Sequence, residues 1–229
     1  MKFAIISDIH GNYPALQAVL SDIEAEKVDR IVCLGDLVGY YCMINEVIET
    51  IREKGIQTIC GNHDYALVFN NGIIERSKTC TRILTRQQQY ITPENIDYLK
   101  QLEHSISFET GHKTYYCVHG GLNDEIDEYI RNIDLDYFEA NNFQKDVLMS
   151  GHTHMVRNEV YGPKRYLNPG SVGQPRDGNP AAAYLLIEDD TYRHKRVKYD
   201  IAAIAEKMRE EQYDEYIYEI LYRGVKIGE

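Results

Sequence analysis

The stretch FAIISDIHGN, residues 3–12, decides the fold. Its apolar half has the length and the branched and aromatic residues typical of a buried strand, which we predict over residues 3–7. The polar half follows directly, and a helix is predicted over residues 13–26 because apolar residues recur there at helical spacing. A strand that passes through polar residues into a helix is typical of α/β sheets, which bind ligands at the carboxyl ends of their strands.

Four more polar clusters follow apolar runs in the same way. They are Gly35-Asp36, Gly61-Asn62-His63-Asp64, His119-Gly120-Gly121 and Gly151-His152-Thr153-His154. Any one of them alone is best interpreted as a turn, since Asn, Asp and Gly favour turns for backbone reasons. Five such clusters, each at a strand end, indicate a single site whose oxygen and nitrogen donors suit two metal ions better than one.

The spacing of these clusters adds detail. Asp8 and His10 are two residues apart on a segment expected to be extended, so both side chains can face the same side. Gly35, Gly61 and Gly151 each precede a cluster of candidate ligands, where a missing Cβ allows a sharp turn.

The ordered set closely resembles the calcineurin-like metallophosphoesterases, in particular the small bacterial and archaeal branch that resembles diadenosine tetraphosphatases. Gly11-Asn12 after the first motif and the late segment Asn168-Pro169-Gly170-Ser171 extend the likeness, which covers residues 2 to about 200. The resemblance implies an α/β fold of two mixed β-sheets packed face to face with flanking helices.

The resemblance also implies the ligands of two divalent ions, with Asp36 bridging. Asp8, His10, Asp36 and His154 would hold the first ion, and Asp36, Asn62, His119 and His152 the second. Without thiolate ligands the site suits Mn or Fe first, with Zn, Co or Ni as alternatives. Such ions lower the pKa of a bridging water, so that hydroxide is available for attack on phosphorus.

Other residues are candidates for the substrate. His63 adjoins the ligand Asn62 without being a family ligand, so it is the candidate general acid; the alternative is a hydrogen bond to a ligand. Asn62 and Arg176 are predicted to bind phosphate, although Arg176 can also be a solvated loop residue. A stripe of basic residues, Lys78, Arg82 and Arg86, is a further candidate for binding polyphosphate. Two tyrosines, Tyr40 and Tyr41, are candidates for stacking on a base. No role is assigned to Asp64; it could orient His63 or form a local salt bridge.

The 229 residues predict one domain over 1–229. A helical insert is expected over about 65–112 and a helical tail over about 201–223. Late strands near 165–167, 181–187 and 191–198 are separated by turns, which predicts a second, more antiparallel sheet.

Composition excludes several classes of protein. The net charge of −11 disfavours duplex nucleic acid as a partner, and no run of apolar residues is long enough to cross a membrane. Five cysteines without CxxC spacing, and a first strand that leaves no room for a signal peptide, predict a cytoplasmic protein. The oligomeric state is left open.

We therefore expect a metal-dependent phosphoric ester or anhydride hydrolase acting on small phosphorylated molecules, with a phosphodiester or a dinucleoside polyphosphate as substrate and nucleotides among the candidates. The alternative within the superfamily is a phosphomonoesterase or protein phosphatase. Protein phosphatases of this superfamily follow the Gly-Asp motif with an arginine-glycine pair and end the third motif in Glu. Here the stretch Gly35-Asp36-Leu37-Val38-Gly39-Tyr40 has no arginine, and the third motif ends in Asp64. A protein that keeps the site only as a structural element is a further alternative.

Overall fold

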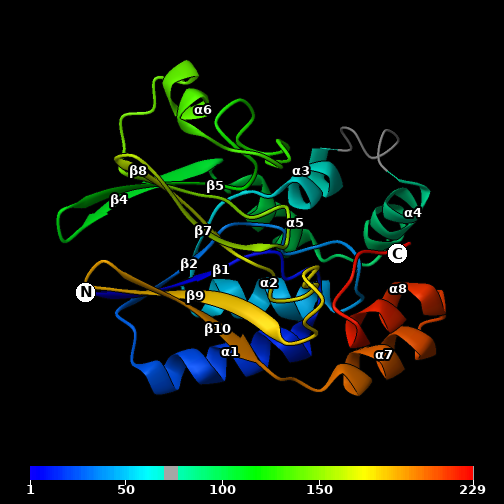
Figure 1. Ribbon diagram of the computed structural model, residues 1–229. Helices are drawn as coiled ribbons and strands as arrows, with labels where there is room; N and C mark the ends of the chain where they lie inside the picture. Colours follow the sequence, from blue (N-terminus) through cyan, green and yellow to red (C-terminus); the bar gives the residue numbers. More distant parts are fainter. Residues whose placement is uncertain (70–76, 229) are drawn as a thin grey trace.

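Two five-stranded sheets packed face to face form the centre of the molecule (Figure 1). The computed structural model describes residues 1–69 and 77–228. The first sheet has the order β10-β9-β1-β2-β3 and the second the order β4-β5-β6-β8-β7, each with parallel and antiparallel pairs. In the first sheet the strands are β1 (Lys2–Ile6), β2 (Arg30–Cys33), β3 (Gln57–Thr58), β9 (Ala182–Glu188) and β10 (Thr191–Val197). In the second they are β4 (Ser105–Thr110), β5 (Lys113–Val118), β6 (Val147–Met149), β7 (Val156–Tyr161) and β8 (Lys164–Pro169).

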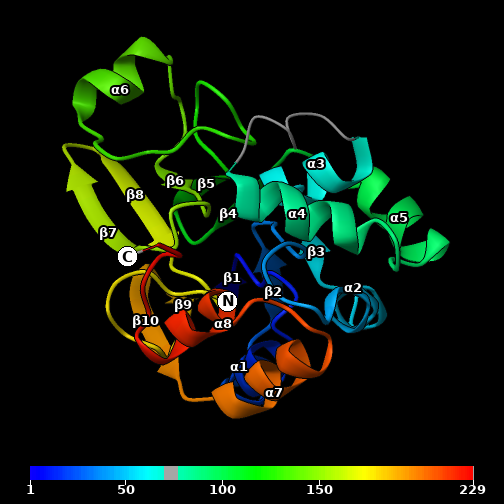
Figure 2. The same cartoon turned by 90° about the vertical axis from the view of Figure 1, so that its right-hand side faces the viewer.

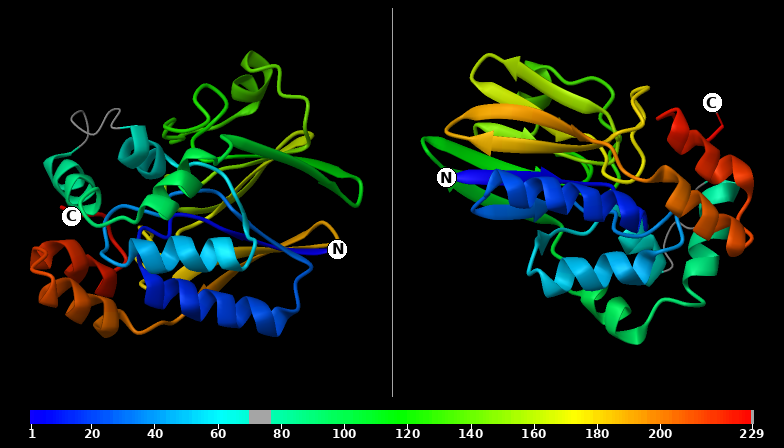
Figure 3. Two further views of the ribbon diagram at one scale, coloured as in Figure 1. Left: turned by 180° about the vertical axis from the view of Figure 1, so that it is seen from behind. Right: turned by 90° about the horizontal axis from the view of Figure 1, so that it is seen from below.

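Alternation along the strands builds two cores. Phe3 and Ile5 of β1 pack with residues of both sheets in the layer between them. Ala4 and Ile6, on the opposite face, pack with the apolar sides of α1 (Tyr13–Glu26) and α2 (Ile44–Glu53), which cover the first sheet (Figure 3). The two mixed sheets with flanking helices confirm the predicted fold class.

The remaining helices surround the sheets. On the side where β1 and β2 end lie α3 (Asn62–Phe69), α4 (Lys78–Gln87), α7 (Ile201–Glu210), α8 (Glu215–Glu219) and a 3₁₀ turn at Ile220–Tyr222 (Figure 2). Further out lie α5 (Pro93–Lys100) and, against the second sheet, α6 (Leu135–Ala140). In the described ranges, none of these helices has the length and apolar run that crossing a bilayer requires.

Two expectations about the strands are wrong. β9 and β10 belong to the first sheet, because β9 pairs antiparallel with β1 through Ala4 and Leu186, rather than joining a second sheet of late strands. The stretch 65–112, expected to be helical, also contains the strand β4, whose alternating residues pair with β5. Residues 70–76 of that stretch lie outside the described residues.

Candidate active site

The structure brings all seven predicted metal ligands into one cluster at the strand ends. Asp8 and His10 follow β1, Asp36 follows β2, and Asn62 begins α3. The second sheet contributes His119 after β5, with His152 and His154 after β6. All are buried except His152, whose side chain is 13% exposed. So many buried polar groups at one point indicate a shared function rather than packing.

The backbone of these loops is strained. Asp8 and His10 both have φ of 54°, in the left-handed region, which corrects the expectation of an extended segment. The same holds for Asp36, His152 and His154, with φ of 55°, 63° and 60°. A non-glycine residue in this region costs of order 1–3 kcal/mol and persists where the surrounding structure imposes it, which is common at functional sites.

Two glycines are required by close approach rather than by backbone conformation. A Cβ on Gly61 would lie 2.2 Å from Asp36 Oδ1, and one on Gly151 would lie 2.1 Å from Ser7 Oγ. Gly35 is required on both grounds, because its φ of 90° favours glycine and a Cβ on it would lie 2.5 Å from the backbone nitrogen of Gly61. The first two glycines therefore let the loops of the site approach one another.

Two imidazole rings face each other through nitrogens that both lack a proton. His10 Nδ1 lies 2.8 Å from the carbonyl oxygen of Val38, and His154 Nδ1 lies 2.6 Å from that of Gln174. Because a carbonyl oxygen only accepts, both Nδ1 atoms donate and both Nε2 atoms present lone pairs. These Nε2 atoms are 3.1 Å apart, and His154 Nε2 is 3.2 Å from Asp8 Oδ1. Three electron-rich atoms this close fit a shared cation.

The pKa shifts of Asp8, His10 and His154 agree with a cation site between these three side chains. Burial lowers the pKa of His10 to about 3 and also lowers the pKa of His154, so both imidazoles are neutral at pH 7. Although burial opposes ionisation, the electrostatic interactions of Asp8 with the nearby rings of His154 and His119 hold its pKa below its ordinary value. Neutral imidazoles beside an ionised carboxylate are the protonation states that metal binding requires.

A second group of donors lies beside the first. His119 Nδ1 donates to the Leu34 carbonyl at 2.7 Å, and its Nε2 lies 3.0 Å from Asn62 Oδ1 and 3.3 Å from Asp36 Oδ2. Although burial opposes protonation, Asp36 raises the pKa of His119 to about 9, so a positive charge is favoured at this point. Asp36 Oδ2 is also 3.6 Å from His10 Nε2, which places this carboxylate between the two groups.

In each of three sets of residues, the ligand atoms lie within 4.8 Å of one another and could hold one ion. They are Asp8, His10 and His154; His10, Asp36 and His63; and Asp36, His119 and His152. The first and third sets are parts of the two predicted ligand sets, without Asp36 in the first and without Asn62 in the third, and Asp36 occurs in two of the three. The second set places His63 near enough to ligate as well as to act as an acid.

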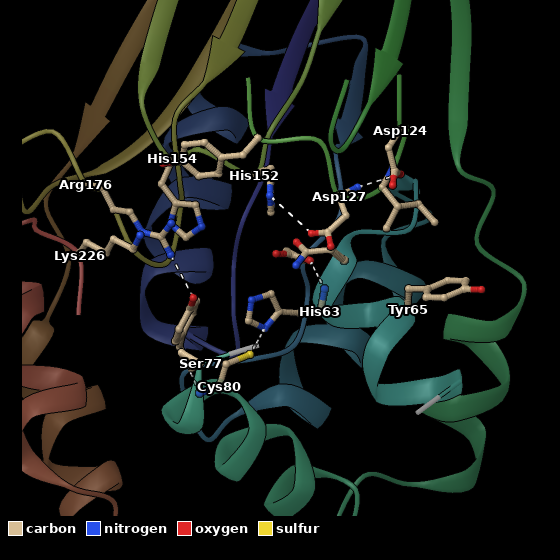
Figure 4. A pocket seen from close by; sticks show the side chains of 15 residues that line it. His63, Tyr65, Ser77, Cys80, Asp124, Asp127, His152, His154, Arg176 and Lys226 are labelled. Carbon is tan, nitrogen blue, oxygen red and sulfur yellow. Dashed lines mark hydrogen bonds and ion pairs between the residues drawn. The ribbon is translucent and has the colours of Figure 1, made fainter. Parts of the chain in front are cut away.

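His63 lies at the edge of the cluster and faces the cavity. Its backbone N–H donates to Asp36 Oδ1 at 2.8 Å, and its ring packs 4.8 Å from the His10 ring and 4.9 Å from that of Tyr40, measured between centroids. On its other side, Cys80 Sγ is 3.8 Å from His63 Nδ1 (Figure 4). The ring is thus positioned by packing, beside but distinct from the pair of facing imidazoles.

Asp64 supports the Asp36 loop. Its carboxylate accepts hydrogen bonds from the backbone N–H groups of Asp36, Leu37, Val38 and Gly61, at 2.8–3.1 Å. Burial, together with the charge of Asp36, raises the pKa of Asp64 to about 7. Neither alternative suggested for Asp64 from sequence, orientation of His63 or a salt bridge, describes this role.

A cavity of ≈ 780 Å³ opens above the cluster (Figure 4). Arg176 lines it, and its guanidinium donates to Gln174 Oε1 at 2.7 and 3.1 Å and to the Tyr40 hydroxyl at 3.2 Å. Tyr40 also lines the cavity. Tyr41 is fully buried and is not among the lining residues, so the expectation that Tyr41 stacks on a base is wrong.

The basic stripe on α4 faces the C-terminal helices rather than the cavity. Arg82 forms an ion pair with Asp214, and Arg86 stacks on the Tyr213 ring with its guanidinium carbon 4.1 Å from the centroid. Lys78 is exposed, and none of the three basic residues is among those that line the cavity. The expectation that this stripe binds polyphosphate is therefore not supported by their positions.

Sequence reasoning missed several residues that line the cavity, among them Asp127, Tyr129 and Lys226. Asp127 Oδ1 lies 3.7 Å from His152 Nε2, and the Tyr129 ring packs 5.3 Å from the His152 ring. Both follow the His119 cluster by a few residues, which was the available signal. Lys226 comes from the end of the chain, where no motif pointed to the site.

The comparisons with known proteins agree with this geometry. Residues 1–191 match the model of the calcineurin-like phosphoesterase superfamily domain. The chain is 32% identical to a metallophosphoesterase structure from Sphaerobacter thermophilus, with a TM-score of 0.80 over 98% of this chain and 100% of that one. It is 26% identical to phosphodiesterase YfcE of Escherichia coli over 83% of this chain and 89% of the relative. A local match, 32% identical, joins 44% of the chain to 37% of the symmetrical bis(5'-nucleosyl)-tetraphosphatase of Sodalis glossinidius. Because the family model covers residues 1–191, a range that contains every candidate ligand, the chain belongs to the calcineurin-like phosphoesterases and is a hydrolase.

Proposed function

We propose that this protein hydrolyses P–O bonds in small phosphorylated molecules, either phosphodiesters or dinucleoside polyphosphates, with the help of two divalent metal ions. The observation that supports this most is the pair of buried donor groups that share Asp36 at the floor of an open cavity. Facing lone pairs on His10 and His154 support a cation between them.

The residues divide into two ligand sets. Asp8, His10 and His154 would hold one ion, while Asn62, His119 and His152 would hold the other, with Asp36 shared. When bound, such ions supply Lewis acidity and make hydroxide available near neutral pH. The donor set of oxygen and imidazole nitrogen suits Mn or Fe, with Zn, Co or Ni as alternatives.

The other residues act on the substrate. His63 lies beside the cluster and faces the cavity, so it is placed to donate a proton to the leaving oxygen. The Asn62 amide and the Arg176 guanidinium both line the cavity and can orient phosphoryl oxygens. Asp64 holds the Asp36 loop in place through its four backbone contacts.

Substrate class follows from the loop after Asp36 and from the relatives. The backbone N–H groups of Leu37 and Val38 are occupied by Asp64, and the loop lacks the arginine that protein phosphatases carry. The phosphodiesterase YfcE matches over most of both chains, while the tetraphosphatase matches locally. Both names support a small diester or anhydride over a phosphoprotein.

One experiment separates these substrate classes. The specificity constant kcat/KM is measured for bis-p-nitrophenyl phosphate, diadenosine tetraphosphate and a phosphoserine peptide, all with the same concentration of Mn²⁺. We expect either small molecule to exceed the peptide by tenfold or more, about 1.4 kcal/mol in transition-state binding. A peptide that ranks first by the same margin would overturn the proposal in favour of a protein phosphatase.

A further inference from the structure

The cavity has two cationic side chains on one wall, and one of them comes from the end of the chain. Among the described residues that line it, Arg176 and Lys226 are the two with permanent positive charge. They lie on the same side of the cavity, while Asp124 and Asp127 lie on the other (Figure 4). An anionic ligand is therefore drawn to the wall that carries Arg176 and Lys226.

Among the residues that the structure describes, neither cation forms an ion pair with a carboxylate. Within residues 1–69 and 77–228, no ion pair forms to Arg176 or to Lys226, although basic residues elsewhere, such as Arg196 with Asp177, are paired. Arg176 is instead held by the neutral groups of Gln174 and Tyr40, which leave its Nη1 donors without a bond to any described residue. A guanidinium oriented in this way is prepared to bind phosphate oxygens.

The tail that carries Lys226 is fixed to the cavity wall on both sides of this residue. Before it, the Gly224 carbonyl accepts from the Gly178 N–H at 2.9 Å, and a Cβ on Gly224 would lie 2.5 Å from the Asn179 carbonyl carbon. After it, Ile227 packs against the apolar cluster around α7 and α8. The tail is therefore bound to the same loop that carries Arg176, which places the exposed Lys226 side chain at the cavity.

The Tyr40 ring lies between the Arg176 side of the cavity and two rings of the ligand cluster. The Arg176 guanidinium carbon is 5.7 Å from the centroid of the Tyr40 ring, which also packs against the rings of His10, His63 and His154, at 4.6, 4.9 and 6.4 Å between centroids. Tyr40 therefore lies between the Arg176 guanidinium and the rings of His10 and His63. The wall is better placed for a second phosphate than for the one under attack.

We propose that Lys226 and Arg176 form a subsite for a second phosphate group of the substrate, so that the enzyme prefers molecules with two or more phosphates. Lys226 is the specificity-determining residue that the tail adds. The inference rests on the proposed function, since it assumes that one phosphate lies at the ligand cluster.

Equilibrium binding tests the subsite without turnover. Calorimetry on the Mn²⁺-loaded protein compares AMP with the α,β-methylene analogue of ADP, whose bridging carbon prevents cleavage between its phosphates. We expect wild type to bind the diphosphate more tightly. Lys226→Met should lower affinity for the diphosphate about tenfold more than affinity for AMP, as expected when one charge-assisted contact is lost.

Matched variants separate the subsite from general effects. Lys198→Met removes an exposed lysine that does not line the cavity, so it should keep the wild-type preference. Lys226→Arg should keep it too, while Gly224→Val, which displaces the tail from Asn179, should lose it. Equal loss of affinity for both ligands, or no loss for either, in Lys226→Met would overturn the subsite. Because binding is measured directly, absence of hydrolysis of bis-p-nitrophenyl phosphate would contradict only the proposed reaction.

Discussion

Two cavities of similar size lie at opposite ends of the same parallel strands. The cavity at the carboxyl ends of β1 and β2 measures ≈ 780 Å³, and the one before β2 and β3 measures ≈ 580 Å³. Lys27, Arg30 and Lys54 line the second cavity, and all three are exposed. The first cavity is instead lined by Asp36 and Asn62, which are buried among the other candidate metal ligands.

The comparison shows that size does not distinguish the functional end. The charged side chains around the second cavity are exposed to water. Gly55 there has φ of 60°, and no atom lies within 4 Å of the position where a Cβ would stand. Around the first, ionised groups are removed from water and six non-glycine residues take left-handed conformations, whereas Lys27 is the one such residue among those that line the second. Buried charge and backbone strain are both costly, so their concentration at one end marks the function.

The largest expected effect comes from changing the shared ligand. Asp36→Asn keeps the shape but removes the charge that would balance two cations. We expect kcat/KM for bis-p-nitrophenyl phosphate to fall roughly 10³-fold or more, about 4 kcal/mol, and the metal content to fall below two ions per chain by elemental analysis. Lys54→Met, at the other cavity, should remain within about twofold of wild type. An Asp36→Asn variant with full activity would abolish the distinction between the two ends.

A smaller effect is expected at His63, which separates proton donation from metal binding. If His63 is a general acid, His63→Ala should retain both ions and lose about 10²- to 10⁴-fold in kcat. The loss should be greatest for esters with alkyl leaving groups, because these need a proton more than p-nitrophenolate does. Loss of metal in His63→Ala would instead assign His63 to the ligand set that it forms with His10 and Asp36.

Sequence reasoning succeeded where the determinants are local. Apolar runs that end in polar residues predicted the strands before Asp8, Asp36 and His119, because strand length and the residues that follow a strand are encoded within a few positions. The ordered motif placed the candidate ligands on one edge, as the structure does. Their left-handed backbone was not predicted, since it follows from contacts between loops, such as that of Gly61 with Asp36.

Reasoning failed where distant segments meet. β9 reaches the first sheet by pairing with β1 across the length of the chain, and no turn between late strands indicates that partner. Arg82 and Arg86 of α4 contact Asp214 and Tyr213 in the turn before α8, and these partners are selected by tertiary packing. Lys226 lies in the cavity because Gly224 is anchored by Gly178, a contact that local pattern does not reveal.

The smallest effect should come from the amino end of the sheet, where charges contribute to stability alone. Glu26, at the end of α1, accepts from Lys195 Nζ at 2.6 Å and from Lys2 Nζ at 2.7 Å, and these hydrogen bonds lower the pKa of Glu26 from 4.5 to about 2. A carboxylate with a lowered pKa stabilises the fold above its unfolded pKa, and this stabilisation is lost as the pH falls from 4.5 towards 2.

Glu26→Gln should therefore lower the thermal midpoint at pH 7 by no more than about 2–4 °C, since partly exposed ion pairs contribute little. The difference from wild type should shrink between pH 4.5 and pH 3 and fall with added salt, while kcat/KM at pH 7 stays unchanged. Glu24→Gln is the control, because the Glu24 side chain is exposed and forms no ion pair with any residue that the structure describes. A Glu26→Gln variant that loses activity as well as stability would show that the two ends are coupled, against the separation that the two cavities indicate.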